Sequence, residues 1–290
     1  MQSNKTAIIT GATSGIGLAA AQRLAGQGVR VIGVGRNAQR CEAAARCILN
    51  TVPDARVEYL MCDLSSQSQI GDLCRKVEQK YPVIDIFVHA AGVIMSRFKA
   101  TDDGLETQFA VNHLAAFIIS ARLMKELDAS ADARVILLSS VAHRHTRLNF
   151  HDLQMRKWYF SLSQYKQTKL CNVLFAAEFN RRFKKTKIRA FTADPGLVKT
   201  NIGHSGMSGL EKMVCRIVIN RGASPDLPAM NICHLALSPE VLKNDAFYWK
   251  NCSPLDPDPY AYNENAARFL WEASEKLSAL TLSPDRLNML

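Results

Sequence analysis

A tyrosine and a lysine four residues apart are the first side chains in this sequence whose spacing suggests chemistry. They are Tyr165 and Lys169, in the segment SQYKQTKL at 163–170. If that segment is helical, as its pattern indicates, the two side chains share one face, one turn apart. A phenol with a pKa of about 10 shuttles protons poorly near neutral pH, and a neighbouring cation would lower that pKa. The pair is therefore a candidate proton donor with its activating partner, although Y-x-x-x-K alone often occurs by chance.

The elements that must position this pair alternate along the chain. The expected strands cover 6–12, 30–36, 56–64, 84–92, 133–140 and 187–196, with a shorter one at 246–250. The expected helices cover 16–28, 39–50, 69–81, about 104–127 and 167–183, the last beginning just before Tyr165. Continuous apolar strands between helices predict an α/β fold: one Rossmann-type domain with a doubly wound parallel sheet of about seven strands and helices on both faces. Ligands of such folds bind beyond the carboxyl ends of the strands.

The first strand ends in TGATSGIG at 10–17, a glycine-rich turn that opens the first helix. Gly11 permits a tight turn, Gly15 lets the main chain approach a pyrophosphate, and Gly17 lets the helix pack on the strand. The helix N-terminus adds free N–H groups and a partial positive charge. We expect the phosphates to contact Gly11, Thr13, Ser14, Gly15, Ile16 and Gly17.

The second strand ends in VGRN, where a site for a free ribose 2′-hydroxyl usually has an acid. Here Arg36 is followed by Asn37, with Arg40 close behind, and a guanidinium suits a 2′-phosphate. The sequence therefore favours NADP(H), with NAD(H) possible, unless Arg36 is only a solvated loop residue. In CDLSS, after the third strand, Asp63 and Leu64 suit an adenine pocket, and Asp63 or Ser65 could also cap the next helix.

The other strand ends supply a reaction site. In HAAG at 89–92, Ala90, Ala91 and Gly92 let the main chain pass close to the cofactor ribose. Asn112, in the apolar run FAVNHL, could hold a water in a proton path or bond locally. One hydroxyl of Ser139 and Ser140 could hold a substrate carbonyl oxygen. After the sixth strand, DPGLVKTNI is expected to meet the nicotinamide end of the cofactor through Pro195, Gly196, Val198 and Thr200.

Composition and charge argue against a nucleic-acid site, a metal site and a membrane span. The 290 residues are 48% hydrophobic, and 36 basic against 26 acidic residues give a net charge of +10. The basic residues are scattered, and the cluster at 181–187 is expected to be the solvated end of a helix rather than a nucleic-acid site. Eight cysteines without C-x-x-C spacing predict buried free thiols and no metal site. Because 1–10 has no apolar run long enough for a signal or an anchor, we expect a soluble, cytoplasmic protein without a membrane span.

Together these motifs resemble the short-chain dehydrogenase/reductase family over about residues 5 to 275. The resemblance rests on TGxxxGxG, CDL, HAAG, Asn112, Ser140, YKQTK and DPG. It implies a catalytic tetrad of Asn112, Ser140, Tyr165 and Lys169. Tyr165 would be the general acid in carbonyl reduction and the base in alcohol oxidation. Lys169 would also bind the nicotinamide ribose, and Asn112 would support a water relay.

A narrower resemblance is to the retinol dehydrogenase-like branch, which includes WW-domain oxidoreductases. It rests on SSVAHR, NFHDLQ, YKQTKLCNVLFAAEF, DPGLVKTNI and ARFLWEASEKL. That branch implies NADP(H) and hydride transfer between a lipophilic carbonyl, such as a retinoid, steroid or xenobiotic aldehyde or ketone, and its alcohol. Two departures stand out: His89 and Ala90 replace the two asparagines of the usual NNAG, and the membrane-anchoring N-terminus of several retinol dehydrogenases is absent.

Substrate specificity is expected in the second half of the single domain, with 1–130 mainly binding cofactor and 131–290 carrying the catalytic and substrate-binding residues. A flexible apolar lid is expected at about 201–225. The candidate substrate contacts are Ala142, His143, Trp158, Phe160, Met207 and Met213. His143 could instead be structural. By resemblance, helices at 104–127 and 163–183 often form dimer faces, so a homo-oligomer is possible. The alternative function is a non-catalytic NADP(H)-binding sensor or scaffold on the same fold.

Overall fold

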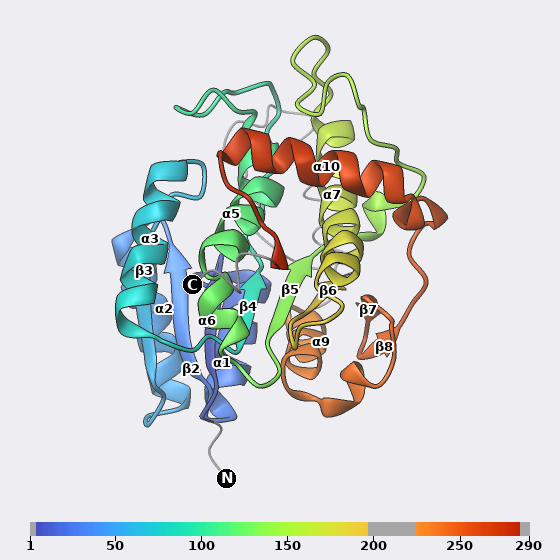
Figure 1. The fold of residues 1–290 in the computed structure, drawn as a ribbon. Coiled ribbons are helices and arrows are strands. Elements are labelled where there is room, and N and C mark those ends of the chain that lie inside the picture. Colours follow the sequence, from blue (N-terminus) through green and yellow to red (C-terminus); the bar gives the residue numbers. More distant parts are fainter. Residues whose placement is uncertain (1–3, 197–223, 285–290) are drawn as a thin grey trace.

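The computed structural model describes residues 4–196 and 224–284, which form an eight-stranded sheet between two layers of helices (Figure 1). The strand order is β3-β2-β1-β4-β5-β6-β7-β8. The first seven strands in this order run parallel, and β8 pairs antiparallel with β7. The strands are β1 Thr6–Thr10, β2 Arg30–Gly35, β3 Val57–Met61, β4 Ile86–His89, β5 Arg134–Leu138, β6 Arg189–Ala193, β7 Tyr248–Lys250 and β8 Ser253–Pro254.

The predicted α/β fold with a doubly wound parallel sheet is confirmed, and the eighth strand is an addition. It is formed by Ser253 and Pro254. Asn251 and Cys252, between β7 and β8, have φ angles of 50° and 61°. Two consecutive positive φ angles define the tight turn that joins antiparallel strands, so the turn itself creates this short edge strand.

Helices cover both faces of the sheet, as the continuous apolar strands predicted. One apolar cluster packs α1, α2 and α9 against the sheet, and the other packs α3, α5, α6, α7 and α10 against the opposite face. The helices are α1 Gly15–Gly26, α2 Ala38–Thr51, α3 Gln67–Lys80, α4 Thr107–Phe109, α5 Ala115–Arg122, α6 Met124–Asp128, α7 Ser161–Arg182, α9 Asp226–Leu237 and α10 Glu264–Ser278. Short 3₁₀ turns occupy Val141–His143, Pro239–Leu242 and Pro259–Tyr262. No described helix is both long and apolar enough to cross a membrane.

The long helix expected at about 104–127 is interrupted, which corrects that prediction. Its first turn starts late because the buried Glu106 carboxylate caps it, accepting from the N–H groups of Gln108 and Phe109. A π-helical turn follows at Ala110–Leu114, and α5 and α6 are separated at Leu123. Such π turns often occur at functional sites, and this one carries Asn112.

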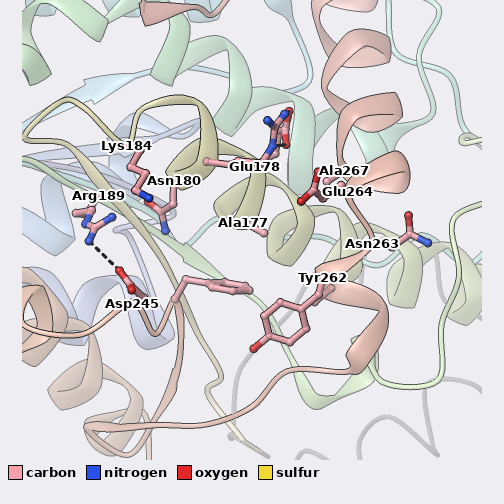
Figure 2. A pocket seen from close by; sticks show the side chains of 13 residues that line it. Ala177, Glu178, Asn180, Lys184, Arg189, Asp245, Tyr262, Asn263, Glu264 and Ala267 are labelled. Atoms are coloured by element: carbon pink, nitrogen blue, oxygen red, sulfur yellow. Dashed lines mark hydrogen bonds and ion pairs between the residues drawn. The ribbon is translucent and has the colours of Figure 1, made fainter.

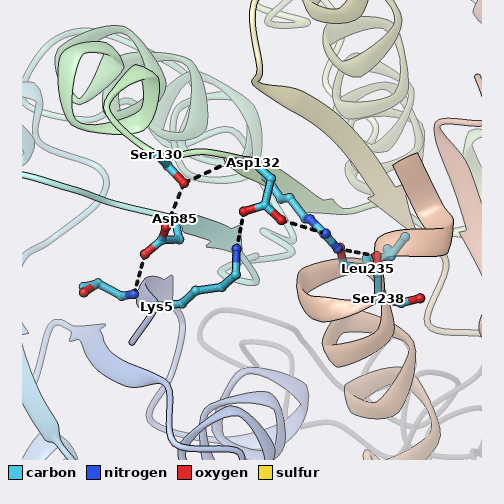
Figure 3. A network of polar contacts seen from close by, with 8 residues as sticks. Lys5, Asp85, Ser130, Asp132, Leu235 and Ser238 are labelled. Carbon is cyan, nitrogen blue, oxygen red and sulfur yellow. Dashed lines mark hydrogen bonds and ion pairs between the residues drawn. The ribbon is translucent and has the colours of Figure 1, made fainter. Parts of the chain in front are cut away.

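A polar network holds the amino ends of β1, β4 and β5 together (Figure 3). The Asp85 carboxylate accepts from the Thr6 main-chain N–H at 2.8 Å and from the Ser130 hydroxyl at 2.7 Å. Lys5, just before β1, forms an ion pair with Asp132, just before β5. Strands that are distant in the sequence are thereby fixed at the edge where they begin.

Arg134 extends this network to α9. Its side chain is 1% exposed, and its guanidinium donates to Asp132 at 3.1 Å. It also donates to the carbonyls of Leu235 and Ser238, at 2.8 and 2.7 Å. These carbonyls end α9, where a helix leaves acceptors unpaired and favours a cation. The buried charge therefore satisfies the helix end and joins α9 to the sheet.

Candidate active site at the carboxyl edge of the sheet

Tyr165 and Lys169 lie one turn apart on α7, as their spacing predicted, and α7 begins four residues before Tyr165. The Lys169 ammonium nitrogen is 5.5 Å from the centre of the Tyr165 ring. The lysine side chain is 5% exposed, and its Nζ donates to the carbonyl of Leu138, the last residue of β5, at 3.1 Å. The pair therefore faces the carboxyl edge of the sheet rather than bulk solvent.

The electrostatics of the pair differ from the expectation that Lys169 lowers the Tyr165 pKa. Burial raises the pKa of Tyr165 to about 12, a hydrogen bond with Ser140 partly opposes this, and Asp194 raises the pKa further. Burial lowers the pKa of Lys169 to about 8. In the protein alone, desolvation outweighs the nearby cation, so the prediction of a lowered tyrosine pKa is corrected for this state.

The two serines at the end of β5 are distinguished by their partners. The Ser139 hydroxyl donates to the main-chain carbonyl of Lys169 at 3.0 Å, which fixes α7 to the sheet. The Ser140 hydroxyl accepts from the main-chain N–H of Ala142 at 3.2 Å and is also hydrogen-bonded to Tyr165. Of the two candidates, Ser140 is thus the one whose hydroxyl can meet a ligand beside Tyr165. Ala142, predicted to contact substrate, lies half-buried in the same turn.

Asn112 is held by protein groups from two elements that are distant in the sequence, and its part in a water path stays a prediction. Its Oδ1 accepts from the N–H of Val93 at 2.7 Å, and its Nδ2 donates to the Val93 carbonyl at 3.0 Å and to Thr168 Oγ1 at 3.1 Å. The π turn aims this fully buried amide at two elements at once. Asn112 therefore ties the segment after β4 to the middle of α7, beside Lys169.

Gly92 marks the point where these groups converge. A Cβ added there would lie 3.6 Å from Lys169 Nζ and 3.7 Å from Asn112 Oδ1. The main chain at this residue therefore runs directly past both polar side chains. The structure brings together Asn112, Ser140, Tyr165 and Lys169 at one edge of the sheet, while their catalytic roles stay predictions.

The histidine that replaces the usual asparagine after β4 has a defined set of partners. The Ala91 N–H donates to Thr10 Oγ1 at 3.3 Å, Thr10 Oγ1 lies 3.0 Å from His89 Nδ1, and His89 Nε2 lies 3.0 Å from the Val111 carbonyl. The carbonyl can only accept, so Nε2 carries the hydrogen and Nδ1 accepts from Thr10. Burial lowers the pKa of His89 to about 3, which keeps the ring neutral. The substitution thus preserves a hydrogen-bonded link from β1 through β4 to the π turn.

The glycine-rich loop has the close contacts that its pattern predicted. Gly11 has a φ of 67°, and a Cβ there would lie 2.8 Å from the Ala91 main chain. A Cβ on Gly17 would lie 2.3 Å from the Gly11 carbonyl oxygen. Only glycine fits either position, so the loop is pressed against the first turn of α1 and the end of β4. Gly15 is the first residue of α1.

The N-terminus of α1 differs from those of its neighbours in a way that fits a phosphate. Ser14, its N-cap, makes no side-chain cap hydrogen bond. In contrast, Asn37 caps α2 by accepting from the Arg40 N–H, and Ser66 caps α3 by accepting from the Gln69 N–H. The α1 end keeps its N–H groups for another acceptor, which suits the pyrophosphate of a dinucleotide.

Of the residues expected to contact the 2′ position of the adenosine ribose, only some are placed as predicted. Arg36 is exposed directly after β2, beside the glycine-rich loop, because Gly35 packs on the Thr13 side chain. The Asn37 side chain is used as the α2 cap, which leaves Arg36 and Arg40 as the candidates for a 2′-phosphate.

Asp63 and Leu64 follow β3 as expected. Asp63 Oδ1 accepts from both the N–H and the hydroxyl of Ser65, at 2.9 and 2.8 Å. Leu64 is 9% exposed. The cap of α3 is Ser66, so the proposed capping by Asp63 or Ser65 was wrong by at least one residue. Because Oδ1 takes the local bonds, the second carboxylate oxygen of Asp63 is the one that can accept from an adenine amine.

The end of β6 contains a buried carboxylate that sequence reasoning missed. Asp194 is 2% exposed, and it accepts from the Tyr248 hydroxyl at 2.7 Å and from the Gly196 N–H at 2.8 Å. Its position in ADPG, directly before Pro195, was the signal that could have identified it. Asp194 fixes the start of the loop expected to meet the nicotinamide. The remaining residues predicted there or in the lid at 201–225 lie outside the described residues: Val198, Thr200, Met207 and Met213.

His143 is structural, so its prediction as a substrate contact is corrected. The ring is fully buried, and its Nδ1 lies 2.7 Å from the Ser140 carbonyl, to which it must donate. Its Nε2 accepts from the Asp258 N–H at 3.1 Å. Both nitrogens thereby hold Ser140 to Asp258, in the segment before α10. The Tyr248 ring packs against His143, with 5.0 Å between the ring centres. Trp158 and Phe160, in contrast, are largely exposed, and their substrate roles stay predictions.

A separate cavity lies at the other end of α7 (Figure 2). It has a volume of about 280 Å³ and opens between the last turns of α7, the start of β7 and the start of α10. Two ion pairs lie in its lining: Arg189 with Asp245 at 3.3 Å, and Arg181 with Glu178 at 2.6 Å. The tetrad candidates do not line it, so we place no chemistry there.

Comparisons with known proteins agree with the fold. The sequence model of a family described as short chain dehydrogenase matches residues 5–210. Human retinol dehydrogenase 13 is 35% identical over 286 residues, which cover 95% of this chain and 85% of that protein. The Brassica napus protein named short-chain dehydrogenase TIC 32 A, chloroplastic, is 31% identical, with 94% and 88% covered. A crystal structure of an uncharacterised Mycobacterium paratuberculosis protein superimposes with a TM-score of 0.75 at 27% identity, covering 96% of this chain and 94% of that one.

Proposed function

Because the chain belongs to the short-chain dehydrogenase family, we propose that it is an NADP(H)-dependent oxidoreductase that interconverts a lipophilic aldehyde or ketone and its alcohol. The retinol dehydrogenases among its relatives support an apolar substrate such as a retinoid or a steroid. The observation that carries the proposal is the convergence of Lys169 and Asn112 at Gly92, with Ser140 and Tyr165 on the same edge.

Each group of the tetrad has a distinct proposed role. Tyr165 donates a proton to the substrate oxygen in reduction and accepts it in oxidation. Ser140, whose hydroxyl lies beside that of Tyr165, would hold the same oxygen. Lys169 has N–H groups beyond the one bonded to Leu138, and these are available to a ribose hydroxyl. Asn112 positions Lys169 and the segment after β4 through its own three hydrogen bonds.

The cofactor would bind along the carboxyl edge and supply or accept the hydride. Its pyrophosphate would lie at the uncapped N-terminus of α1 and its adenine near Leu64. Arg36 would contact the 2′-phosphate. Once the positive nicotinamide of the oxidised form is bound, its charge would favour the phenolate of Tyr165 and oppose the effect of burial.

The first test is NADPH oxidation by the full chain over a panel of aldehydes, ketones, steroids and retinal, with NADH in parallel. We expect turnover with NADPH and at least one apolar carbonyl. Tight NADPH binding without turnover on any member would contradict the enzyme proposal and favour a cofactor-binding sensor or scaffold.

The cofactor preference has its own test in Arg36→Asp. Losing a charge-assisted hydrogen bond and adding repulsion should weaken NADPH binding by about 10- to 100-fold, with little change for NADH. Arg46→Asp, on the exposed surface of α2, is the matched control because it makes the same change in net charge away from the site. Equal weakening of NADPH and NADH by Arg36→Asp would contradict the 2′-phosphate role.

A further inference from the structure

Three large apolar side chains project into solvent where the chain enters α7. Trp158 is 79% exposed, Phe160 65% and Leu162 59%, and the first two are the most exposed large apolar residues of the described chain. We call these three residues the apolar patch. All three lie within seven residues of Tyr165: Trp158 and Phe160 directly precede α7, and Leu162 lies in its first turn. Leaving such side chains in water forgoes about 1.5–3 kcal/mol each relative to full burial.

Tyr159, the residue between Trp158 and Phe160, is held inward. Its hydroxyl accepts from Gln108 Nε2 at 2.5 Å and lies 3.1 Å from Glu106 Oε1, a fully buried carboxylate. Phe98 packs against its ring edge-on, 5.9 Å away. Trp158 and Phe160, on either side of this anchored tyrosine, are exposed.

The surface around the patch is basic. Arg156, Lys157 and Lys166 are exposed and flank the three apolar residues in the sequence. Arg97 and Lys99, also exposed, lie on either side of Phe98 and so are brought next to Tyr159. None of these five cations forms an ion pair with a carboxylate of the described residues.

The acidic groups nearby do not cancel this charge. Asp152 is half-buried and accepts from the Lys157 N–H. The Asp103 carboxylate accepts from the Gln67 N–H, and Asp102 is exposed beside it. Five cations around an apolar centre therefore face at most two exposed carboxylates, which leaves this end of the molecule positive.

We propose that the apolar patch and its basic rim dock the protein onto the surface of an anionic lipid bilayer. Tryptophan prefers the membrane interface, and lysine and arginine can keep their charges at the headgroups while their stems lie along apolar neighbours. Each basic residue near an anionic surface adds about 1 kcal/mol of attraction. A second copy of this chain is a poorer occupant, because joining two such patches would bring like charges together.

This orientation would place the entrance of the candidate active site at the membrane. The patch belongs to the segment that leads directly to Tyr165, so a lipid-soluble carbonyl could pass from the bilayer without crossing water. That consequence rests on the proposed function. The docking itself does not, and it can be measured without turnover.

The test is sedimentation of the full chain with vesicles of phosphatidylcholine alone or mixed with phosphatidylserine. We expect binding to the anionic vesicles that weakens as salt is raised. The triple variant Trp158→Ser/Phe160→Ser/Leu162→Ser should reduce this binding by about tenfold or more. The control Met61→Ser/Leu227→Ser/Leu255→Ser removes three exposed apolar side chains elsewhere and should bind as wild type does. Thermal unfolding and NADPH binding verify that both variants are folded.

A further double variant separates the contribution of charge to vesicle binding from that of the apolar contact. Lys157→Ala/Lys166→Ala should weaken binding to phosphatidylserine vesicles several-fold and leave weak binding to phosphatidylcholine unchanged. The proposal is overturned if the wild type does not sediment with anionic vesicles, or if the patch and control variants bind equally. It is also overturned if the wild type is a dimer in solution that only the patch variant dissociates, because a second copy would then be the occupant. Absence of enzymatic turnover would contradict the proposed function but leave these binding results intact.

Discussion

The two edges of the sheet use polar side chains in opposite ways. At the amino edge, charged groups are paired with other groups of the protein: Arg134 with Asp132 and two carbonyls, and Asp85 with Thr6 and Ser130 (Figure 3). At the carboxyl edge, some groups are anchored on one side and keep another donor for a ligand. Lys169 donates to the Leu138 carbonyl and has further N–H groups, and α1 begins without a side-chain cap.

This difference separates stability from function. A satisfied buried polar group stabilises the fold, and removing one partner leaves the other without compensation. A group with an unused hydrogen-bonding position adds less to stability but can bind a ligand without reorganising. Substitutions at the amino edge should therefore lower stability, and those at the carboxyl edge should lower activity or cofactor affinity.

The largest effect is expected from Tyr165→Phe. Removing the proton donor should lower kcat by about 10³-fold, while the phenyl ring keeps its packing and the free energy of unfolding changes little. Steady-state kinetics and urea unfolding measure the two quantities. Tyr262→Phe, which removes an exposed hydroxyl at the cavity of Figure 2, is the control and should change neither. Retained turnover in Tyr165→Phe would reject its role as proton donor.

The opposite result, a loss of stability with unchanged kcat, is expected from Arg134→Met at the amino edge. The substitution leaves two carbonyls at the end of α9 without their donor and removes one of the two cations paired with Asp132, so it should lower the free energy of unfolding by about 3 kcal/mol. The kcat of the folded enzyme should stay the same. Arg75→Met breaks an exposed pair with Asp72 and should cost less than about 0.5 kcal/mol. A similar small loss in both variants, measured by urea unfolding, would contradict the structural role of the amino edge.

The sequence predicted what depends on local pattern and missed what depends on distant partners. The glycine-rich turn and the Tyr165–Lys169 spacing are local, and both are where they were expected. The six longer predicted strands are present but end one to three residues earlier than expected. The π turn around Asn112 depends on bonds to Val93 and Thr168, so periodicity alone indicated one continuous helix.

Histidine roles and pKa values were the least predictable features. The role of His143 was left open between substrate contact and structural residue because its partner Asp258 comes 115 residues later in the chain, where no local signal identifies it. The pKa of Tyr165 depends on burial, which the i, i+4 spacing does not report. The part of the chain at 197–223, where the lid was expected, lies outside the described residues.

Lowering the pH should destabilise the protein through two buried histidines, His89 and His113. Burial lowers the pKa of His89 to about 3 and that of His113 to about 4, against about 6.5 in an unfolded chain. The unfolded chain binds protons below pH 6.5 that the folded protein excludes, so stability falls as the pH drops below that value and continues to fall toward the folded pKa values. At pH 5.5 each histidine should contribute a loss of about 1.4 kcal/mol.

His113→Gln tests this assignment. Its Nε2 lies 3.0 Å from the Ser274 hydroxyl, and glutamine can keep a donor there without titrating. The loss in unfolding free energy between pH 7 and pH 5.5 should shrink by about 1 kcal/mol relative to wild type. His151→Gln, at an exposed site, should leave the pH dependence unchanged. An unchanged pH dependence in His113→Gln would assign the acid sensitivity to other groups.

The smallest effects are expected at two serines that precede helices, Ser14 before α1 and Ser66 before α3. Ser66 caps α3 by accepting from the Gln69 N–H, so Ser66→Ala should lower the free energy of unfolding by about 1 kcal/mol. Ser14 makes no such bond at α1, so Ser14→Ala should leave the stability of the cofactor-free protein within a few tenths of a kcal/mol. The order should reverse for NADPH, whose dissociation constant should rise about 3- to 10-fold in Ser14→Ala and stay constant in Ser66→Ala. Equal losses of stability in the two variants would mean that Ser14 caps α1 in solution, and the uncapped N-terminus would then no longer support a phosphate site.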